Sequence, residues 1–168
     1  MGESHINHIK TDSSAPLASF KGEYEHSVDN KGRVSFPAKM RKYVSPLAED
    51  RFTILRGIDR CLYLYPDNEW ETVEKSLDAI NSFSAEGRRV KRAFLRSAED
   101  VELDKQNRIA LPGSLMDWAG ISNKAVFLGS GDRIEIWSPE NLDAEDGTLD
   151  FDGYQELFEK VLGDVDGE

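Results

Sequence analysis

The chain has 168 residues, of which 39% are hydrophobic and 32% charged, and its formal net charge is −11. A chain of this length forms one ordinary domain or two small ones and can bury a modest core. Its single cysteine, Cys61, excludes an internal disulfide and a metal site built from several thiolates. We see no apolar leader in residues 1–20 and no apolar run of about 18 residues, so we expect neither export nor membrane spanning and place the protein in the cytoplasm.

The negative charge is concentrated near the C-terminus. Residues 135–168 hold twelve acidic side chains against Lys160 alone, so this segment carries the whole net charge. Two other stretches are basic: residues 30–48 contain five cations and no acid, and residues 88–92 read RRVKR. A charge run is most often a solvated face, so these stretches alone do not establish a binding function.

One pattern occurs twice in the chain. Residues 29–37 read DNKGRVSFP and residues 104–112 read DKQNRIALP, and each has an Asp, an Arg four residues later, two apolar positions and a proline. The segments 52–68 and 126–141 also match one another. Because two copies are too few for a solenoid, we expect a pseudo-twofold pair of units that completes one core.

Each copy predicts the element order β-β-α-β-β. In the first, we expect a hairpin between residues 22–28 and 33–36, with Asp29 capping the turn and Gly32 supplying a backbone position with positive φ. The other elements of this copy are a short helix from Pro37 and strands at 52–56 and 61–65. The second copy repeats the plan with a turn at 105–107, a strand at 108–111, a helix from Pro112 and strands at 125–128 and 133–137.

Helices are predicted between the copies and at the C-terminus. Trp70 begins an apolar stripe, and a second helix starts at the N-cap Ser84 and turns Val90 and Phe94 inward. The segment 151–162 also has one apolar face, whereas the Gly/Asp-rich stretch around 143–153 is interpreted as a linker. We divide the chain into a flexible N-terminal extension (1–19), a first unit (20–69), connecting helices (70–93), a second unit (94–142) and an acidic C-terminal segment with a helix (143–168).

The stretches FKGEYEHSVDNKGRVSFPAKMR, LDKQNRIALP and FLGSGDRIEIWSPENL together resemble the MraZ family of bacterial transcriptional regulators, over about residues 20–142. The resemblance implies an α+β, mainly β fold of two tandem AbrB-like swapped-hairpin units with a barrel-like core. It also implies a cytoplasmic, nucleoid-associated DNA-binding protein that forms a ring-like homo-oligomer. Proteins similar to it bind short direct repeats in the promoter of their own gene, at the head of the division and cell-wall gene cluster, usually as repressors.

We assign DNA contact first to Lys31 and Arg33, because a basic turn tip projects from its hairpin and Arg contacts guanine or phosphate through two parallel hydrogen bonds. The family resemblance indicates the same residues. Arg41 and Lys39, on the short helix that follows, extend the expected footprint, and Lys21 is a weaker addition.

The acidic members of the repeated pattern have a structural interpretation. A carboxylate is a poor neighbour for phosphate and a good turn cap, so Asp29 and Asp104 are expected to shape the two turns. The second copy departs from the family pattern, with Asn107 where glycine is usual and Met116 where Arg is usual, and acidic sequence precedes it. We expect this copy to serve folding and subunit contacts more than DNA binding, and Arg108 is equally a DNA contact or a structural partner.

Other functions have less support in the sequence. We find no phosphate-binding loop and no nucleophile-base motif, and His5, His8 and His26 accompany no carboxylate cluster, so we expect no enzyme, metal, cofactor or small-molecule substrate. The alternative is an oligomeric scaffold that binds a protein partner through its acidic face. The basic segment 88–92 either lines a DNA path or pairs with acids of the C-terminal segment or a neighbouring subunit, and we favour the pairing.

Overall fold

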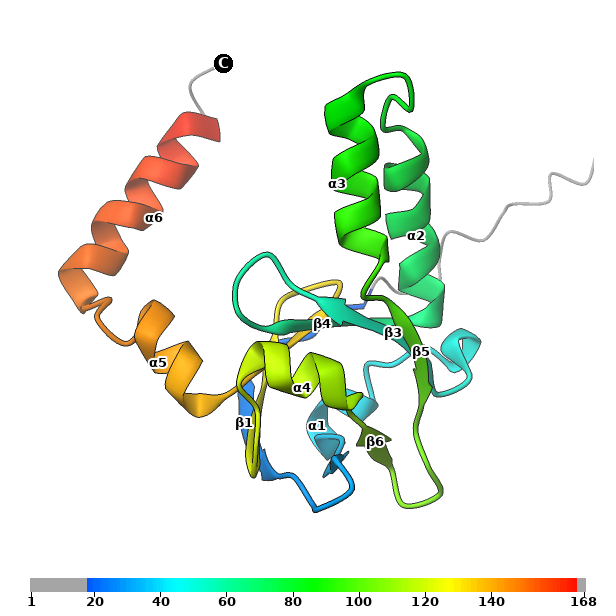
Figure 1. The fold of residues 1–168 in the computed structure, drawn as a ribbon. Coiled ribbons are helices and arrows are strands. Elements are labelled where there is room, and N and C mark those ends of the chain that lie inside the picture. Colours follow the sequence, from blue (N-terminus) through cyan, green and yellow to red (C-terminus); the bar gives the residue numbers. More distant parts are fainter. Residues whose placement is uncertain (1–17, 166–168) are drawn as a thin grey trace, which may run out of the picture.

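A computed structural model describes residues 18–165, so the expected flexibility of residues 1–17 and the positions of His5 and His8 lie outside the described residues (Figure 1). The strands are β1 (Glu23–Ser27), β2 (Arg33–Ser35), β3 (Arg51–Arg56), β4 (Leu62–Pro66), β5 (Glu99–Glu102), β6 (Arg108–Ala110), β7 (Lys124–Gly129) and β8 (Ile134–Trp137). The helices are α1 (Ala38–Arg41), a short 3-10 helix (Pro46–Ala48), α2 (Asp67–Asp78), α3 (Ala85–Leu95), α4 (Gly113–Ala119), α5 (Pro139–Asp146) and α6 (Phe151–Val165).

The two repeats exchange strands with one another. Six strands form one antiparallel sheet in the order β1-β7-β8-β4-β3-β5, and β2 pairs with β6 in a separate two-stranded ribbon. The order reads the same from both ends when each strand is replaced by its repeat counterpart. Strand β1 of the first copy therefore pairs with β7 of the second, and β5 of the second pairs with β3 of the first. The mixed, mainly β fold and the pseudo-twofold relation of the copies agree with the sequence analysis.

The predicted local hairpins have a different form in the structure. The two arms of the first hairpin are joined at a single bridge, Val28 to Val34, and then separate, because β1 enters the large sheet and β2 enters the ribbon. The exchange satisfies the backbone groups of each arm with strands from the other copy. The turn is thus stabilised by residues that are close in the sequence, whereas its two arms are stabilised by pairing with distant strands.

The core lies on both faces of the large sheet. On the face toward the ribbon, Val34 and Ile109 pack with Phe52 and Phe127, and all four are nearly inaccessible to solvent. On the other face, Tyr65 belongs to a second apolar cluster that the helices cover. All five residues of β4 are buried, as expected for a central strand with both faces covered.

Helices α2 and α3 form a hairpin that projects from the sheet (Figure 1). The side chain of Ser84 accepts a hydrogen bond from the backbone N–H of Gly87 at 3.2 Å, so the predicted N-cap of α3 is confirmed. Phe94 stacks on Trp70 of α2 with ring centroids 6.2 Å apart. The expectation that Val90 points inward is wrong: its side chain is 57% exposed, because the contact with α2 is made by Phe94.

The C-terminal helices leave the body of the molecule. Helix α5 starts at the N-cap Ser138 and is anchored by Leu142, whereas α6 stands apart from the sheet (Figure 1). The predicted linker around 143–153 is too long, since most of it is helical and only residues 147–150 separate α5 from α6. The acidic residues of this stretch are exposed, so the helical conformation leaves them in contact with solvent.

The ribbon gives a direct test of the shared core. Replacing Ile109 by alanine should lower the free energy of unfolding by about 2–5 kcal/mol, because the side chain is fully buried between the ribbon and the sheet. Ile58→Ala is the matched control, since Ile58 is 85% exposed and its loss should change stability by less than about 0.5 kcal/mol. Urea unfolding at one protein concentration measures both, and equal effects would contradict this description of the core.

Candidate nucleic-acid interface

The first Asp-x-x-x-Arg turn is built around one carboxylate. Asp29 Oδ1 accepts hydrogen bonds from the backbone N–H groups of Lys31 and Arg33, both at 2.9 Å. Its Oδ2 accepts from Arg33 Nε at 2.7 Å. The same side chain therefore shapes the turn and orients the guanidinium group.

The second turn repeats this geometry. Asp104 Oδ1 accepts from the backbone N–H groups of Gln106 at 2.8 Å and Arg108 at 2.9 Å, and Oδ2 accepts from Arg108 Nε at 2.9 Å. Asn107 has a φ of 57°, in the left-handed region that asparagine tolerates. The departure from glycine at this position thus leaves the turn intact.

Gly32, at the equivalent position of the first turn, has a second constraint. Its φ is +76°, and a Cβ atom there would lie 3.1 Å from the carbonyl oxygen of Leu111 and 3.2 Å from the sulfur of Met116. The first turn packs against the segment that follows β6, so it requires the smallest residue for conformation and for space.

Both aspartates are held in their ionised form. For Asp29, the backbone N–H of Arg33 lowers the carboxyl pKa below its usual 3.8, with the Arg33 side chain and the Lys31 N–H adding to the effect. For Asp104, the backbone N–H of Arg108 is the main cause of a lowered pKa. Because the folded pKa values are lowered, the stabilisation is present above the ordinary pKa and is lost as the pH falls through the folded values. The turns are thus fully formed at neutral pH.

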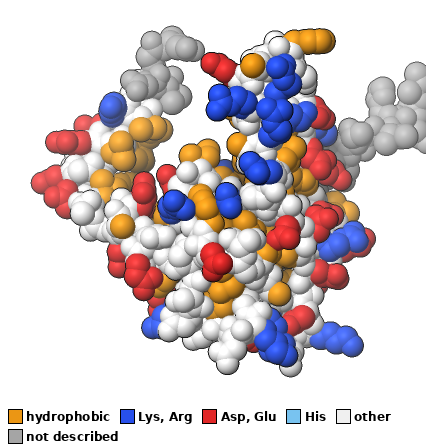
Figure 2. All heavy atoms as spheres, viewed as in Figure 1, with side chains coloured by type: hydrophobic (Ala, Val, Ile, Leu, Met, Phe, Trp, Pro, Cys, Tyr) orange, Lys and Arg blue, Asp and Glu red, His pale blue; other side chains and the backbone are white. Residues whose placement is uncertain are grey.

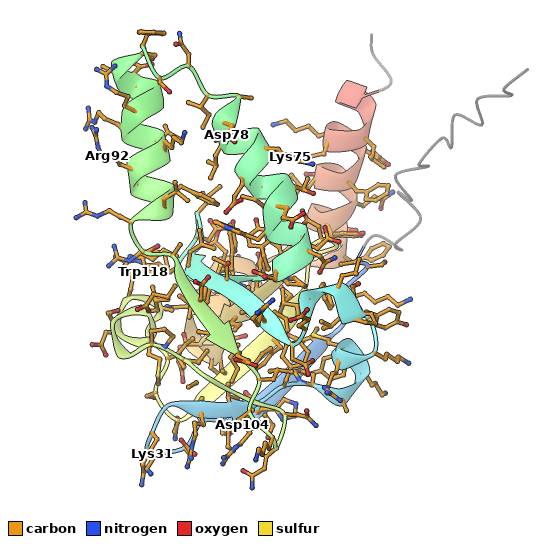
Figure 3. The ribbon with its side chains drawn as sticks, turned by 90° about the vertical axis from the view of Figure 1, so that its right-hand side faces the viewer. Lys31, Lys75, Asp78, Arg92, Asp104 and Trp118 are labelled. Atoms are coloured by element: carbon orange, nitrogen blue, oxygen red, sulfur yellow. The ribbon has the colours of Figure 1, made fainter. Side chains whose placement is uncertain are left out.

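The two turns lie side by side. In the ribbon, Ser35 is opposite Arg108, and Arg108 Nη1 lies 4.0 Å from Asp29 Oδ2 of the other turn. Figure 3 shows Lys31 and Asp104 at the same end of the molecule. We call residues 29–33 and 104–108 together the paired-turn surface. The second copy, which we expected to serve folding and subunit contacts more than DNA binding, contributes half of this surface.

Helix α1 flanks the second turn and not the turn that precedes it in the sequence. The backbone N–H of Phe36, just before α1, donates to the carbonyl of Asn107 at 2.9 Å, and Arg41 lines a surface hollow together with Asn107. Lys39 is exposed on the same helix, while Arg41 Nη2 lies 3.5 Å from Asp50 Oδ2. The exchange of strands thus places the cations of α1 beside the second turn.

Helix α4 is the counterpart of α1 beside the first turn. Met116 of α4 lines a hollow with residues 28–32. Since Met116 stands where the resemblance predicts an arginine, this side of the paired-turn surface gains no cation from its flanking helix. The two flanks therefore differ in charge although their backbones correspond.

Lysines supply most of the uncompensated positive charge here. Arg33 and Arg108 each pair with the aspartate of their own turn. Lys31, Lys39 and Lys105 are exposed and form no ion pair with residues 18–165. Sequence reasoning missed Lys105, although the repeat offset already placed it in the second turn.

Lys21 lies elsewhere. It follows Phe20, which bridges to Gly131, and so stands at the end of β1 that is remote from the first turn. The sequence proximity of Lys21 to the other cations is not kept in the fold, because β1 runs between them.

The structure also describes groups that could support other chemistry. Burial raises the pKa of the Cys61 thiol to about 12, which leaves it a protonated core side chain. Within residues 18–165, no group of three or more His, Cys, Asp or Glu side chains could hold a metal ion. Over the same residues, no helix has both the length and the apolar character needed to cross a membrane.

The chain matches known proteins over most of its length. The family profile described as "MraZ protein, putative antitoxin-like" covers residues 19–93 and 94–144. Relatives named Transcriptional regulator MraZ include proteins from three bacteria. The protein from Natranaerobius thermophilus is 43% identical over 124 residues, which are 74% of this chain and 84% of the relative. The protein from Desulforamulus reducens is 36% identical over 143 residues, 85% of this chain and 97% of the relative. The protein from Marinomonas sp. is 36% identical over 148 residues, 87% of this chain and 98% of the relative.

These matches confirm the resemblance drawn from the repeated Asp-x-x-x-Arg pattern. The two profile matches fall on the two strand-exchanging repeats and include both halves of the paired-turn surface. The chain belongs to the MraZ family, a family of transcriptional regulators and not of enzymes.

Proposed function

We propose that the chain is a sequence-specific, DNA-binding transcriptional regulator that holds DNA on the paired-turn surface. In keeping with the family resemblance, it acts in the cytoplasm in association with the nucleoid. It binds short direct repeats as a ring-like homo-oligomer in the promoter of its own division and cell-wall gene cluster, and represses that cluster. The observation that carries the proposal is the adjacency of two preformed Arg-presenting turns with exposed lysines around them.

The contacts would divide between positioning and readout. Lysines such as Lys31, Lys39 and Lys105 are suited to phosphates, which fix register without reading sequence. Arg33, held by its Nε, presents both Nη groups without a hydrogen bond to the described residues, a geometry suited to the O6 and N7 of guanine. Arg108 and Arg41 complete the proposed surface, whereas Lys21 lies outside it.

Pre-orientation by aspartate supports this use of Arg33. A free arginine side chain loses rotamer freedom on binding, at a cost of about 0.5–1.5 kcal/mol. The 2.7 Å bond to Asp29 has already ordered the side chain before DNA arrives. The aspartate is then useful for DNA binding although its charge alone repels phosphate.

The small number of cations on one copy favours an oligomer. A handful of phosphate contacts gives non-specific dissociation constants of about 10⁻⁴–10⁻⁶ M at physiological salt. Several copies that meet several DNA repeats turn the later contacts into intramolecular ones and strengthen binding by about 10²–10⁴. Assembly is therefore part of the proposed binding mechanism.

The first experiment compares the double variant Lys31→Ala/Arg33→Ala with the wild type on labelled duplex from upstream of the protein's own gene. We expect affinity to fall about tenfold or more and the log-log salt slope to shrink by about one, since one phosphate contact (Lys31) and one base contact (Arg33) are lost. Fluorescence anisotropy between low and physiological salt measures both. The matched control is Lys21→Ala/Lys75→Ala, which removes the same charge away from the paired-turn surface, since Lys21 lies at the far end of β1 and Lys75 lies on α2 (Figure 3).

The same titrations separate the two functional interpretations. If the wild-type protein binds its upstream DNA no more tightly than scrambled DNA, the regulator proposal is wrong. In that case the scaffold interpretation, in which the acidic C-terminal segment binds a protein partner, becomes the leading one.

A second experiment tests the contribution of α1. Lys39→Ala/Arg41→Ala should weaken binding and lower the salt slope by about one to two, because both cations flank the second turn. Lys21→Ala should leave affinity and slope unchanged, since Lys21 lies at the other end of β1. The opposite ranking of these variants would show that the footprint extends along β1 and not over α1.

A third experiment uses the sign of a charge effect. Asp29→Asn removes a negative charge. If Asp29 merely repelled DNA, the variant protein would bind DNA more tightly than the wild type. We expect the reverse, a loss of about three- to tenfold, because the charge-assisted bond that orients Arg33 is lost. Asp132→Asn, an exposed position on the loop before β8, is the charge-matched control in the same anisotropy assay.

A further inference from the structure

Two helices of this chain present surfaces that the described residues leave uncovered: α6, and the part of α3 outside the Phe94 contact with α2, which includes Val90 and Leu95. Helix α3 has no buried residue along its eleven positions. None of the side chains described on α6 is buried either, and they include a stripe of large apolar groups, which are Phe151, Tyr154, Leu157, Phe158, Val161 and Leu162. Most helical stability in proteins comes from packing of an amphipathic face, so both helices need a surface that one described chain does not provide.

The two uncovered surfaces are opposite in charge. Helix α3 carries four cations and one acid, and a shallow hollow on it is lined by the stems of Arg89, Arg92 and Arg96 together with Ala93. Through residue 163, α6 carries three acids and Lys160 as its one cation. Arginine stems cover apolar side chains while their guanidinium groups pair with carboxylates, so α3 is chemically suited to receive α6. Figure 2 shows the basic side chains on the α2–α3 hairpin and the apolar stripe on α6.

We propose that α6 of one copy of the chain packs against α3 of a second copy. This inference rests on the homo-oligomer of the proposed function and adds to it the surfaces that join the copies. The contact joins two unlike surfaces, α6 of one copy and α3 of the next, and such a contact generates a ring when it repeats around a closing rotation.

The structure favours a second copy over the same chain as the partner. Leu142 anchors α5, and Asn141 Nδ2 of α5 donates to the carbonyl of Ala119 at 2.8 Å. Asp150 caps the start of α6: its Oδ1 accepts from Gly153 N at 2.7 Å and its carbonyl accepts from Tyr154 N at 2.9 Å. Helix α6 stands apart from the α3 of its own chain (Figure 1).

The position of α3 argues against DNA as its occupant. Lys31 of the paired-turn surface and Arg92 of α3 lie at opposite ends of the molecule, and Arg92 points away from α2 (Figure 3). A duplex that lay on the turns of one copy would be remote from the α3 of that copy.

Paired charge reversals test the contact. One variant carries Arg89→Glu/Arg92→Glu on α3, and the other carries Glu156→Lys/Glu159→Lys on α6. Each replaces an attraction by a repulsion, so each alone should raise the dissociation constant of self-association by about tenfold or more in sedimentation velocity. All four substituted side chains are exposed, so far-UV circular dichroism should show both variants folded.

Mixing the two variants gives the decisive result. In an equimolar mixture, the acidic α6 of the first variant meets the basic α3 of the second, and the reversed helices match as well. We expect the mixture to recover the wild-type mass, with the two variants alternating. A contact within one chain could not be restored by mixing, so lack of recovery would overturn the proposal.

Controls separate this proposal from DNA binding. Lys21→Glu/Lys124→Glu reverses two exposed cations away from both helices and should leave the mass unchanged. An α3 variant that keeps its mass but loses DNA affinity would assign α3 to DNA and overturn the inference. If the charge reversals on α3 and α6 do not change self-association, the α6–α3 proposal is wrong. If Lys31→Ala/Arg33→Ala still weakens DNA binding in that case, the proposed function stands.

Discussion

The pairing of β2 with β6 is the constraint on which the rest of the structure depends. It forces each repeat to give its first strand to the other, and it brings two turns that are 75 residues apart in the sequence into contact. The same pairing packs Gly32 against Leu111 and Met116 and buries Val34 with Ile109. A single short ribbon thus sets the core, the turn chemistry and the composition of the paired-turn surface.

A strongly acidic protein can still present a basic surface, because charge acts locally. Exposed charges separated by more than about 8–10 Å are largely screened at physiological ionic strength. The surplus acid lies in β8 and beyond, whereas the paired-turn surface is at the ribbon end. Within that surface, each aspartate is neutralised by its own arginine, so the lysines determine the local sign. The net charge therefore says little about binding at the turns.

Several features followed from the sequence because they depend on near neighbours. The Ser84 cap and the β-β-α-β-β order depend on a few adjacent residues. What the sequence did not reveal depends on distant partners. The local pattern predicted plain hairpins, whereas the arms of each turn pair with the other repeat, α1 flanks the second turn, and Phe94 rather than Val90 faces α2. Local periodicity cannot choose between faces that only tertiary packing distinguishes.

Salt affects both the proposed DNA contact at the turns and the proposed contact between α6 and α3. Phosphate contacts at the turns release counterions, and contacts between an acidic α6 and a basic α3 are screened by the same ions. If one contact holds DNA and the other holds the oligomer, rising salt weakens binding once through lost phosphate contacts and again through lost avidity. The apparent salt slope of the assembly then exceeds the number of phosphates touched by the turns. A slope measured on protein locked in one oligomeric state would count the phosphates alone, and the difference between the two slopes would measure how far assembly depends on opposite charges.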